Sequence, residues 1–264
     1  MSGLADPAYL IENHRFPKVF ATGKLLSVIY PYYRKRDVLL RSLEHLRRQR
    51  LDGCRSDQIE VIVVDDGSPD DGIASVLPEE VVYLYQRKNG FGAARARNTG
   101  AKLANGRYLV FLDPDILVEP GYTDAVLRGF CTHGDRMVQC GYVDSYYFEG
   151  SPDPRLQYGV WEAPNRPTDR FYQVISGNMA VSQELFMEVG GFDEDLVYGE
   201  LEDTLFGYQV GLRSGTAVFF NTDMRAVHVP HPPGLAHANG AMTREIIRRK
   251  WPAFHADFIE RATR

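Results

Sequence analysis

Two aspartates, Asp113 and Asp115, lie on either side of Pro114, directly after the apolar run at residues 108–112. Two carboxylates on one short turn offer the hard oxygen ligands that Mg²⁺ and Mn²⁺ prefer, and phosphate oxygens can complete such a coordination shell. The proline restricts the turn between them. A structural role fits equally well, with Asp115 capping the next turn and Asp113 pairing with an arginine. The turn by itself leaves both interpretations open.

Two further polar turns follow apolar runs. Asp65-Asp66-Gly67-Ser68 follows residues 59–64, and Pro31-Tyr32-Tyr33-Arg34 follows residues 25–30. An Asp-Asp-Gly-Ser turn is by itself commonly only a helix cap. The order and placement of the three turns, rather than any one of them, suggest a shared site.

The stretch NGFGAARARNTG, residues 89–100, brings glycines and two arginines to the start of an expected helix. Arg95 and Arg97 are able to offset carboxylates, to contact a nucleotide or to form salt bridges on a helix face. The stretch matches neither G-x-G-x-x-G nor G-x-x-x-x-G-K-[ST], which counts against a Rossmann dehydrogenase and a P-loop NTPase.

The elements that would position these turns alternate along the first half of the chain. Short apolar or β-branched runs predict strands, and segments with apolar residues at a helical period predict helices. The predicted strands are residues 25–30, 59–64, 81–85 and 108–112, and the predicted helices are residues 37–50 and 92–105. This alternation favours a largely parallel sheet with crossover helices, whose strand ends meet at one edge. The three polar turns would then form a single site.

The second half of the chain is less regular. We expect strands at 138–147, 174–180 and 216–220, helices at 183–189, 202–212 and 243–262, and a long loop at 151–170. No internal repeat, low-complexity tract or clear linker is visible, so we expect a single domain over residues 1–264.

Composition and charge exclude several classes of protein. The formal net charge of −5 argues against non-specific binding to nucleic acid. No run of about 18 apolar residues predicts a membrane span, and the first residues do not resemble a signal peptide. Three scattered cysteines favour reduced thiols in a cytoplasmic protein. The basic C-terminal segment 243–264 fits a helix packed on the domain, or one in peripheral contact with the inner face of a membrane.

Five segments together resemble the family-two glycosyltransferases with the A-type, nucleotide-diphosphosugar-binding fold. They occur in the family's order and cover roughly residues 25–232: LSVIYPYYRKRDVLLRSLEHL, IEVIVVDDGSPDDG, NGFGAARARNTGAKLANGRYLVFLDPD, SGNMAVSQELFMEVGGFDED and ELEDTLFGYQVGLRSG. The resemblance implies an α/β protein, a three-layer α/β/α sandwich around a mostly parallel, Rossmann-like mixed sheet. It divides the chain into a nucleotide-binding half (25–120), an acceptor-binding and catalytic half (121–232) and a C-terminal lid and helix (233–264).

The resemblance also implies roles on the donor side of the site. Asp66 would read the nucleobase and Asp65 would support its turn, while Asp113 and Asp115 would form the D-x-D motif. Asp115 is the stronger metal ligand of the two, with Asp113 nearer the ribose or the metal. The remaining residues expected to bind the nucleotide sugar are Pro31, Tyr33, Arg95, Arg97, Gly177 and Asn178.

Glu202 and Asp203 resemble the family's acidic pair at a helix start. Asp203 would be the base that takes the proton of the acceptor hydroxyl, and Glu202 would orient the acceptor or serve as the base instead. Because Glu200 lies close by, the sequence leaves open which of these acids is the base. In a purely structural role, Glu202 and Asp203 would favour the helix dipole. The chain departs from the family at Leu205 and Gln209, where related members often have a second acid and an arginine.

A histidine after the last core strand can complete the metal shell in A-type enzymes. His228 is the candidate for that ligand, and His231 is expected to contact the diphosphate or to order a closing loop. The segment 231–242, rich in proline and glycine, would be a lid over the donor.

The expected function is transfer of a sugar, with inversion and with the help of Mn²⁺ or Mg²⁺, from a nucleotide diphosphosugar to a hydroxyl acceptor. UDP-sugars are the commonest donors in the resembling family, and the acceptor would be a glycan, a lipid-linked intermediate or a small molecule. A retaining transferase of the same fold and a non-catalytic nucleotide-sugar-binding protein are the alternatives. A nucleotidyltransferase would need a glycine-rich phosphate loop after the first strand, and PYYRKRD contains no glycine.

Overall fold

The computed structural model describes residues 23–144, 164–230 and 240–259. The strands are β1 (Leu26–Tyr32), β2 (Ile59–Asp65), β3 (Val82–Tyr85), β4 (Tyr108–Leu112), β5 (Ile116–Val118), β6 (Met137–Asp144), β7 (Pro167–Thr168), β8 (Asn178–Ser182) and β9 (Ala217–His228). The helices are α1 (Arg36–Arg47), α2 (Ile73–Val76), α3 (Ala93–Leu103), α4 (Tyr122–His133), α6 (Gln183–Val189), α7 (Glu202–Gly211), α8 (Gly240–Lys250) and α9 (Pro252–Phe254).

The strands form one mixed sheet in the order β3-β2-β1-β4-β8-β6-β9-β5, with β7 paired to β9 outside this path. Strands β3, β2, β1 and β4 are parallel to one another. The next strand, β8, is antiparallel to both β4 and β6, so β6 and its parallel partner β9 run in the same direction as the first four. The mostly parallel, mixed sheet expected for the chain is therefore confirmed.

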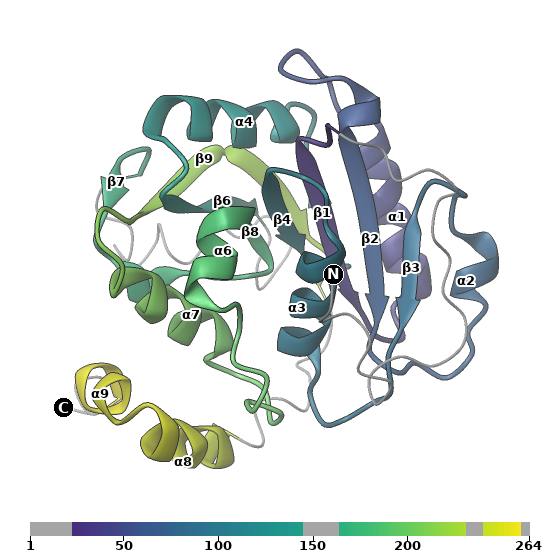
Figure 1. Cartoon of the computed structure of the whole chain (residues 1–264). Helices are drawn as coiled ribbons and strands as arrows, with labels where there is room; N and C mark the ends of the chain where they lie inside the picture. The colour runs from purple at the N-terminus through teal and green to yellow at the C-terminus, as the bar shows by residue number, and fades with distance from the viewer. Residues whose placement is uncertain (1–22, 145–163, 231–239, 260–264) are drawn as a thin grey trace.

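Helices cover both faces of the sheet, as Figure 1 shows for α3, α6 and α7 on the near side and α1 behind β2. Successive side chains along a strand point to opposite faces of the sheet and so belong to two different cores. On β4, for example, Val110 and Leu112 belong to the core that includes α1 and α4, whereas Leu109 and Phe111 belong to the core that includes α3, α6 and α7. This is the expected three-layer sandwich.

Helices α8 and α9 lie apart from the sheet, beside α7 (Figure 1). They share a small third core with α7 and the segment before it, made of Leu196, Leu205, Ile247 and Phe254. The single helix expected over 243–262 is interrupted after Lys250, because Pro252 cannot continue the backbone hydrogen-bond ladder.

Several elements of the second half differ from the expectation. Helix α4 and strand β5 were not predicted, although the buried apolar residues Tyr122, Ala125, Val126 and Phe130 of α4 follow a helical period. Strand β8 begins only at Asn178, because Gly177 forms a turn whose carbonyl accepts from the amide of Asp113. Strand β9 extends well past residue 220 to His228, since a register shift in β6 at Gly141/Tyr142 restores its pairing.

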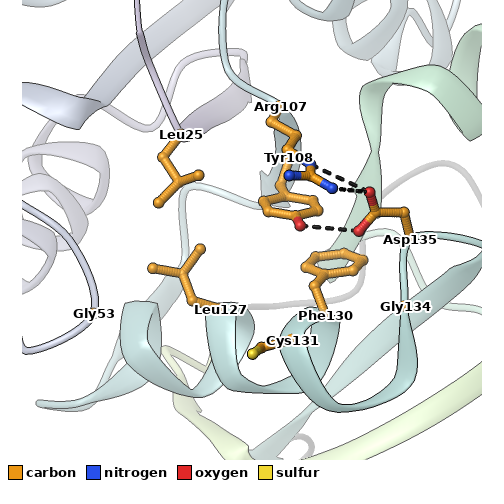
Figure 2. Close-up of a pocket in the computed structure, with 9 residues that line it drawn as sticks. All are labelled: Leu25, Gly53, Arg107, Tyr108, Leu127, Phe130, Cys131, Gly134 and Asp135. Atoms are coloured by element: carbon orange, nitrogen blue, oxygen red, sulfur yellow. Dashed lines mark hydrogen bonds and ion pairs between the residues drawn. The ribbon is translucent and has the colours of Figure 1, made fainter.

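A hollow lies at the amino end of β4, on the edge opposite the acidic turns. Figure 2 shows Arg107 and Tyr108 directed toward Asp135, with the rings of Tyr108 and Phe130 side by side. The Tyr108 hydroxyl donates to Asp135 at 2.9 Å, and the two rings stack at 4.1 Å. None of the predicted site residues lines this hollow. Of the helices described, none is both long and apolar enough to cross a membrane.

Gly100 lies where α3 packs on β1, and its substitution tests that close approach. An added Cβ atom would lie 2.5 Å from Cγ2 of the buried Ile29. Overpacking costs about 1–3 kcal/mol and exceeds the helix propensity that Ala gains over Gly, about 1 kcal/mol or less. Gly100→Ala should therefore lower the free energy of unfolding measured with urea. Lys102→Ala on the exposed face of the same helix is the control and should change it by less than about 0.5 kcal/mol. A Gly100→Ala protein at least as stable as wild type would contradict this packing.

Candidate active site

The acidic turns meet at one edge of the sheet because β1 pairs in parallel with both β2 and β4. Asp65 and Asp66 follow β2, and Asp113 and Asp115 follow β4. The amide of Asp66 donates to the carbonyl of Tyr32 at the end of β1, which ties the first two strand ends together. The fold thus brings the three polar turns of the sequence to a common location.

Asp66 is buried and accepts hydrogen bonds on both carboxylate oxygens. Oδ1 accepts from Gln86 at 2.8 Å and from Arg95 at 3.0 Å, while Oδ2 accepts from Lys88 at 2.5 Å and from the amide of Gly92 at 3.0 Å. Arg95 therefore offsets a carboxylate, one of the roles that the sequence left open. The ring of Tyr33 lies beside this group, with Lys88 Nζ 4.0 Å from its centroid.

Asp65 supports the turn beneath Asp66. Its Oδ1 accepts from the amide of Ser68 at 2.7 Å, and its Oδ2 accepts from the hydroxyl of Tyr83 at 2.9 Å. Burial raises the pKa of Asp65, and the bonds from Ser68 and Tyr83 oppose that rise. Pro31 lies within β1 as a buried strand residue, paired with Val64.

Asp115 lies between a lysine and a histidine. Lys35, just before α1, forms an ion pair with Asp115 Oδ2. His228 Nε2 lies 3.8 Å from the same oxygen, because β5 pairs antiparallel with β9 and places Ile116 opposite His228. Sequence reasoning missed Lys35, although its place just beyond the first strand was a signal that it would reach this edge.

Arg97 links the D-x-D turn to the acidic pair. Its side chain is buried, and it donates to Asp113 Oδ1 at 2.8 Å and to Glu202 Oε1 at 3.3 Å. Asp113 lies in the segment expected to bind the nucleotide (25–120) and Glu202 in the segment expected to be catalytic (121–232), so one guanidinium links the two. In this arrangement Arg97 contacts carboxylates and not a solvent-facing surface.

Glu202 and Asp203 begin α7 with perturbed acidities. Burial and the neighbouring charge of Asp203 raise the pKa of Glu202 to about 7, and Arg97 opposes the rise. Burial also raises the pKa of Asp203. Its Oδ1 accepts from the amide of Thr204 at 2.8 Å and its Oδ2 from that of Ser176 at 3.4 Å. A carboxylate whose pKa is raised is a better proton acceptor, as a general base requires.

The turn before this pair is strained. Glu200 and Leu201 both adopt left-handed backbone conformations, each with φ 66°. For residues other than glycine such a conformation costs on the order of 1–3 kcal/mol and persists only where the surroundings hold it. Strain of this kind collects at functional sites, and here it directly precedes Glu202.

Gly177 and Asn178 are placed differently from each other. Gly177 lies against Asp113, where an added Cβ would come within 2.7 Å of Oδ2, so only glycine fits without a shift. Asn178 is buried in β8, and its side-chain amide bonds to Tyr122 and to the carbonyls of Tyr142 and Met224. The structure does not bring the Asn178 side chain to the carboxylate cluster. His231 and most of the expected lid lie outside the described residues.

The donor groups at Asp115 fit a divalent cation held jointly with a ligand. Within residues 23–144, 164–230 and 240–259, no set of three His, Cys, Asp or Glu side chains is arranged to hold a metal by itself. Asp115 and His228 supply an oxygen and a nitrogen at one point, and the ammonium of Lys35 shows that a cation is accommodated there. Mg²⁺ and similar ions are commonly held by one or two carboxylates together with substrate phosphates.

Comparisons with known proteins agree with this architecture. Residues 27–190 match the family model described as Glycosyl transferase family 2. Validoxylamine A glucosyltransferase of Streptomyces hygroscopicus subsp. jinggangensis (strain 5008) is 29% identical over 240 residues, covering 78% of this chain and 56% of that protein. Pre-mycofactocin glycosyltransferase of Mycobacterium tuberculosis is 32% identical over 154 residues, 54% of this chain and 32% of that protein. The chain spans about half the length of the validoxylamine A glucosyltransferases it matches.

Two solved structures share the fold at low identity. Staphylococcus aureus TarS 1–349 in complex with UDP-GlcNAc has a TM-score of 0.66 at 18% identity, covering 85% of this chain and 64% of that one. GalNAc-T7 with UDP, GalNAc and Mn²⁺ has a TM-score of 0.65 at 17% identity, covering 88% of this chain and 50% of that one. These likenesses confirm the expected A-type fold.

Removing the Arg97 charge tests the link between the two halves. Loss of one partner from a buried ion pair costs about 3–5 kcal/mol, and Arg97→Met leaves Glu202 and Asp113 without their shared cation. We expect the free energy of unfolding at pH 8 to fall by about 3 kcal/mol. The penalty should be smaller at pH 5.5, because Glu202, with its pKa raised to about 7, can be protonated there.

Arg248→Met is the matched control, because among the described residues Arg248 forms an ion pair with Glu245 alone, on the surface of α8. Its effect should stay below about 1 kcal/mol. Equal losses in both variants, or a penalty for Arg97→Met that grows toward low pH, would show that Arg97 does not join the two halves.

Proposed function

This chain belongs to glycosyl transferase family 2, and on that premise we propose that it transfers a sugar from a nucleotide diphosphosugar to a hydroxyl acceptor, with inversion at the anomeric carbon. The observation that carries the proposal is the Arg97 bridge. It places the D-x-D turn, suited to the donor's diphosphate, next to an acidic pair suited to activating the acceptor. A donor site and a base within reach of each other are what a direct displacement needs.

On the donor side, the proposal assigns the nucleobase to the region of Tyr33 and Asp66 and the diphosphate to Asp113 and Asp115. The exposed ring of Tyr33 is available for stacking. Asp66 is already held by four donors, so a base that hydrogen-bonds to it would displace one of them. Of these four groups, Lys88 has the most exposed side chain, which makes it the one most easily displaced.

A divalent cation, Mn²⁺ or Mg²⁺, is proposed to be held by Asp115, with His228 and Asp113 as further ligands. When bound, such a cation would offset the charge that develops on the departing diphosphate. The ion pair between Lys35 and Asp115 would have to open to admit it, leaving the lysine free to contact phosphate oxygens.

For the chemical step, Asp203 is proposed to take the proton of the acceptor hydroxyl. As that oxygen forms its bond to the anomeric carbon, the bond from that carbon to the diphosphate oxygen breaks, and the nucleotide diphosphate leaves. Attack from the face opposite the leaving group inverts the configuration. Glu202, held by Arg97, would orient the acceptor, or act as the base in place of Asp203.

The donor is proposed to be a UDP-sugar. The structural neighbours crystallised with UDP-GlcNAc and with UDP support that choice. Two relatives that cover 78% of this chain are named validoxylamine A glucosyltransferases, so UDP-glucose is the first donor to test.

A retaining transferase of the same fold is the second candidate, since GGFDE before an acidic helix is also similar to the polypeptide N-acetylgalactosaminyltransferases. Comparison of the anomeric configuration of product and donor by NMR separates the two. Inversion supports the proposal, and retention would replace it.

Binding of the donor should be measurable by thermal shift. UDP with Mn²⁺ at about 100 times its dissociation constant should add about 2.7 kcal/mol of stability, or several degrees in Tm. Asp115→Asn should abolish the part of the shift that depends on Mn²⁺, whereas Asp223→Asn, on the exposed side of β9, should retain it. If no nucleotide diphosphate raises Tm with or without Mn²⁺, the donor site is wrongly assigned.

Asp203→Asn tests the base. A positioned general base contributes about 10²–10⁴-fold to rate, so kcat should fall by that range while the thermal shift with UDP and Mn²⁺ stays as in wild type. Glu202→Gln, assayed in parallel, shows which acid of the pair is the base by the larger loss of kcat. Turnover of Asp203→Asn near the wild-type rate, with donor binding intact, would remove Asp203 from the mechanism.

A further inference from the structure

The loop between α6 and α7 brings the chain to the acidic pair, and both of its flanks are held from outside. We call residues 191–201 the approach loop. On one side Asn98 of α3 donates to the carbonyl of Phe192 at 2.8 Å and accepts from its amide at 2.9 Å. On the other side lie the C-terminal helices α8 and α9.

Asp193 is the main attachment of the approach loop to the C-terminal helices. Its carboxylate is buried, accepting from Lys250 Nζ at 2.8 Å on one oxygen and from Trp251 Nε1 at 2.6 Å on the other. Lys250 also donates to Asp195 at 2.6 Å. Although burial alone would raise the pKa of Asp193, the bonds from Lys250 and Trp251 lower it. Asp193 is therefore an ionised carboxylate with hydrogen bonds to both oxygens, and we call its contacts with Lys250 and Trp251 the junction at Asp193.

Two further contacts hold the loop closer to the acidic pair. The buried hydroxyl of Thr243 in α8 donates to the carbonyl of Gly199 at 2.6 Å. Gly240 lies so close to Glu200 that an added Cβ would come within 2.4 Å of Oε2. Helix α8 therefore packs directly on the strained turn at Glu200 and Leu201.

The third contact is apolar and reaches α7 itself. Leu205, one turn after Glu202, is fully buried against Leu196 of the loop and Ile247 and Phe254 of the C-terminal helices. Related members often have an acid where Leu205 stands, so this chain has an apolar anchor at that point in place of a charge.

We infer that the C-terminal helices position Glu202 and Asp203 for the reaction, with Asp193, Lys250 and Trp251 as positioning residues that touch neither donor nor acceptor. The inference rests on the proposed function. Two successive left-handed residues persist only if their surroundings hold them, and α8 provides contacts on both sides of that turn. Loosening the junction at Asp193 would let the start of α7 move, and a displacement of about 1 Å at a reacting group can cost about 10²-fold in rate.

The test uses substitutions that retain side-chain bulk. Lys250→Met removes the ammonium and Trp251→Phe removes the indole N–H donor. Each should lower kcat about 10-fold or more while changing the donor KM by less than about threefold, because the residues proposed to bind the donor's base and diphosphate follow β1, β2 and β4. Lys250→Arg should restore most of kcat. Arg248→Met, which changes a charge on the same helix but only breaks a surface pair with Glu245, should behave as wild type.

Hydrogen exchange of the amides of residues 193–205 provides a readout independent of turnover. Exchange there should quicken in Lys250→Met and Trp251→Phe but not in Arg248→Met. A lower Tm with wild-type kcat, KM and exchange in the two variants would overturn the inference and leave only a stabilising role. If the wild-type protein turns over no donor, the proposed function fails. Unchanged hydrogen exchange in Lys250→Met and Trp251→Phe would separately refute the attachment of the approach loop to the C-terminal helices.

Discussion

The buried guanidinium of Arg97 is the interaction on which the site depends. Three carboxylates, those of Asp113, Glu202 and Asp203, converge near the carboxyl edge of the sheet, and such a cluster is unfavourable without a cation among them. Arg97 comes from α3, whose packing on β1 and β2 is determined by the parallel sheet. The first half of the chain thus supplies the charge that allows the acids of the second half to lie close to Asp113. By donating to Asp113 and to Glu202, Arg97 sets how these two carboxylates lie relative to each other.

The first half of the fold could be predicted well from the sequence because its local signals are strong. Strands rich in β-branched residues end at polar turns, and the parallel connection places every turn at the same edge. The acidic turns could therefore be grouped before any coordinates were known. The resemblance to a family then indicated roles for Asp115 and Asp203 that spacing alone left open.

Other features depend on tertiary contacts that leave little trace in the sequence. The side chain of Asn178 bonds within the core because Tyr142 of β6 and Met224 of β9 present their carbonyls to it. Lys35 follows the first strand, a signal that it would lie at this edge of the sheet, but its pairing with Asp115, 80 residues further along the chain, depends on the fold. The C-terminal segment has a basic surface and an apolar face, but nothing in its composition showed that Lys250 and Trp251 would converge on Asp193.

The long pairing of β9 has a consequence for how such a protein can diversify. His228 lies where β9 pairs with β5, so the proposed donor end of the site belongs to the sheet. The acidic pair is instead reached through a loop supported by helices that lie outside the region matched by the family model, residues 27–190. Under the proposed function, substitutions in the loop and helices would change the acceptor side while the sheet continues to hold the proposed donor residues. New acceptor specificities could then arise without rebuilding the proposed nucleotide site.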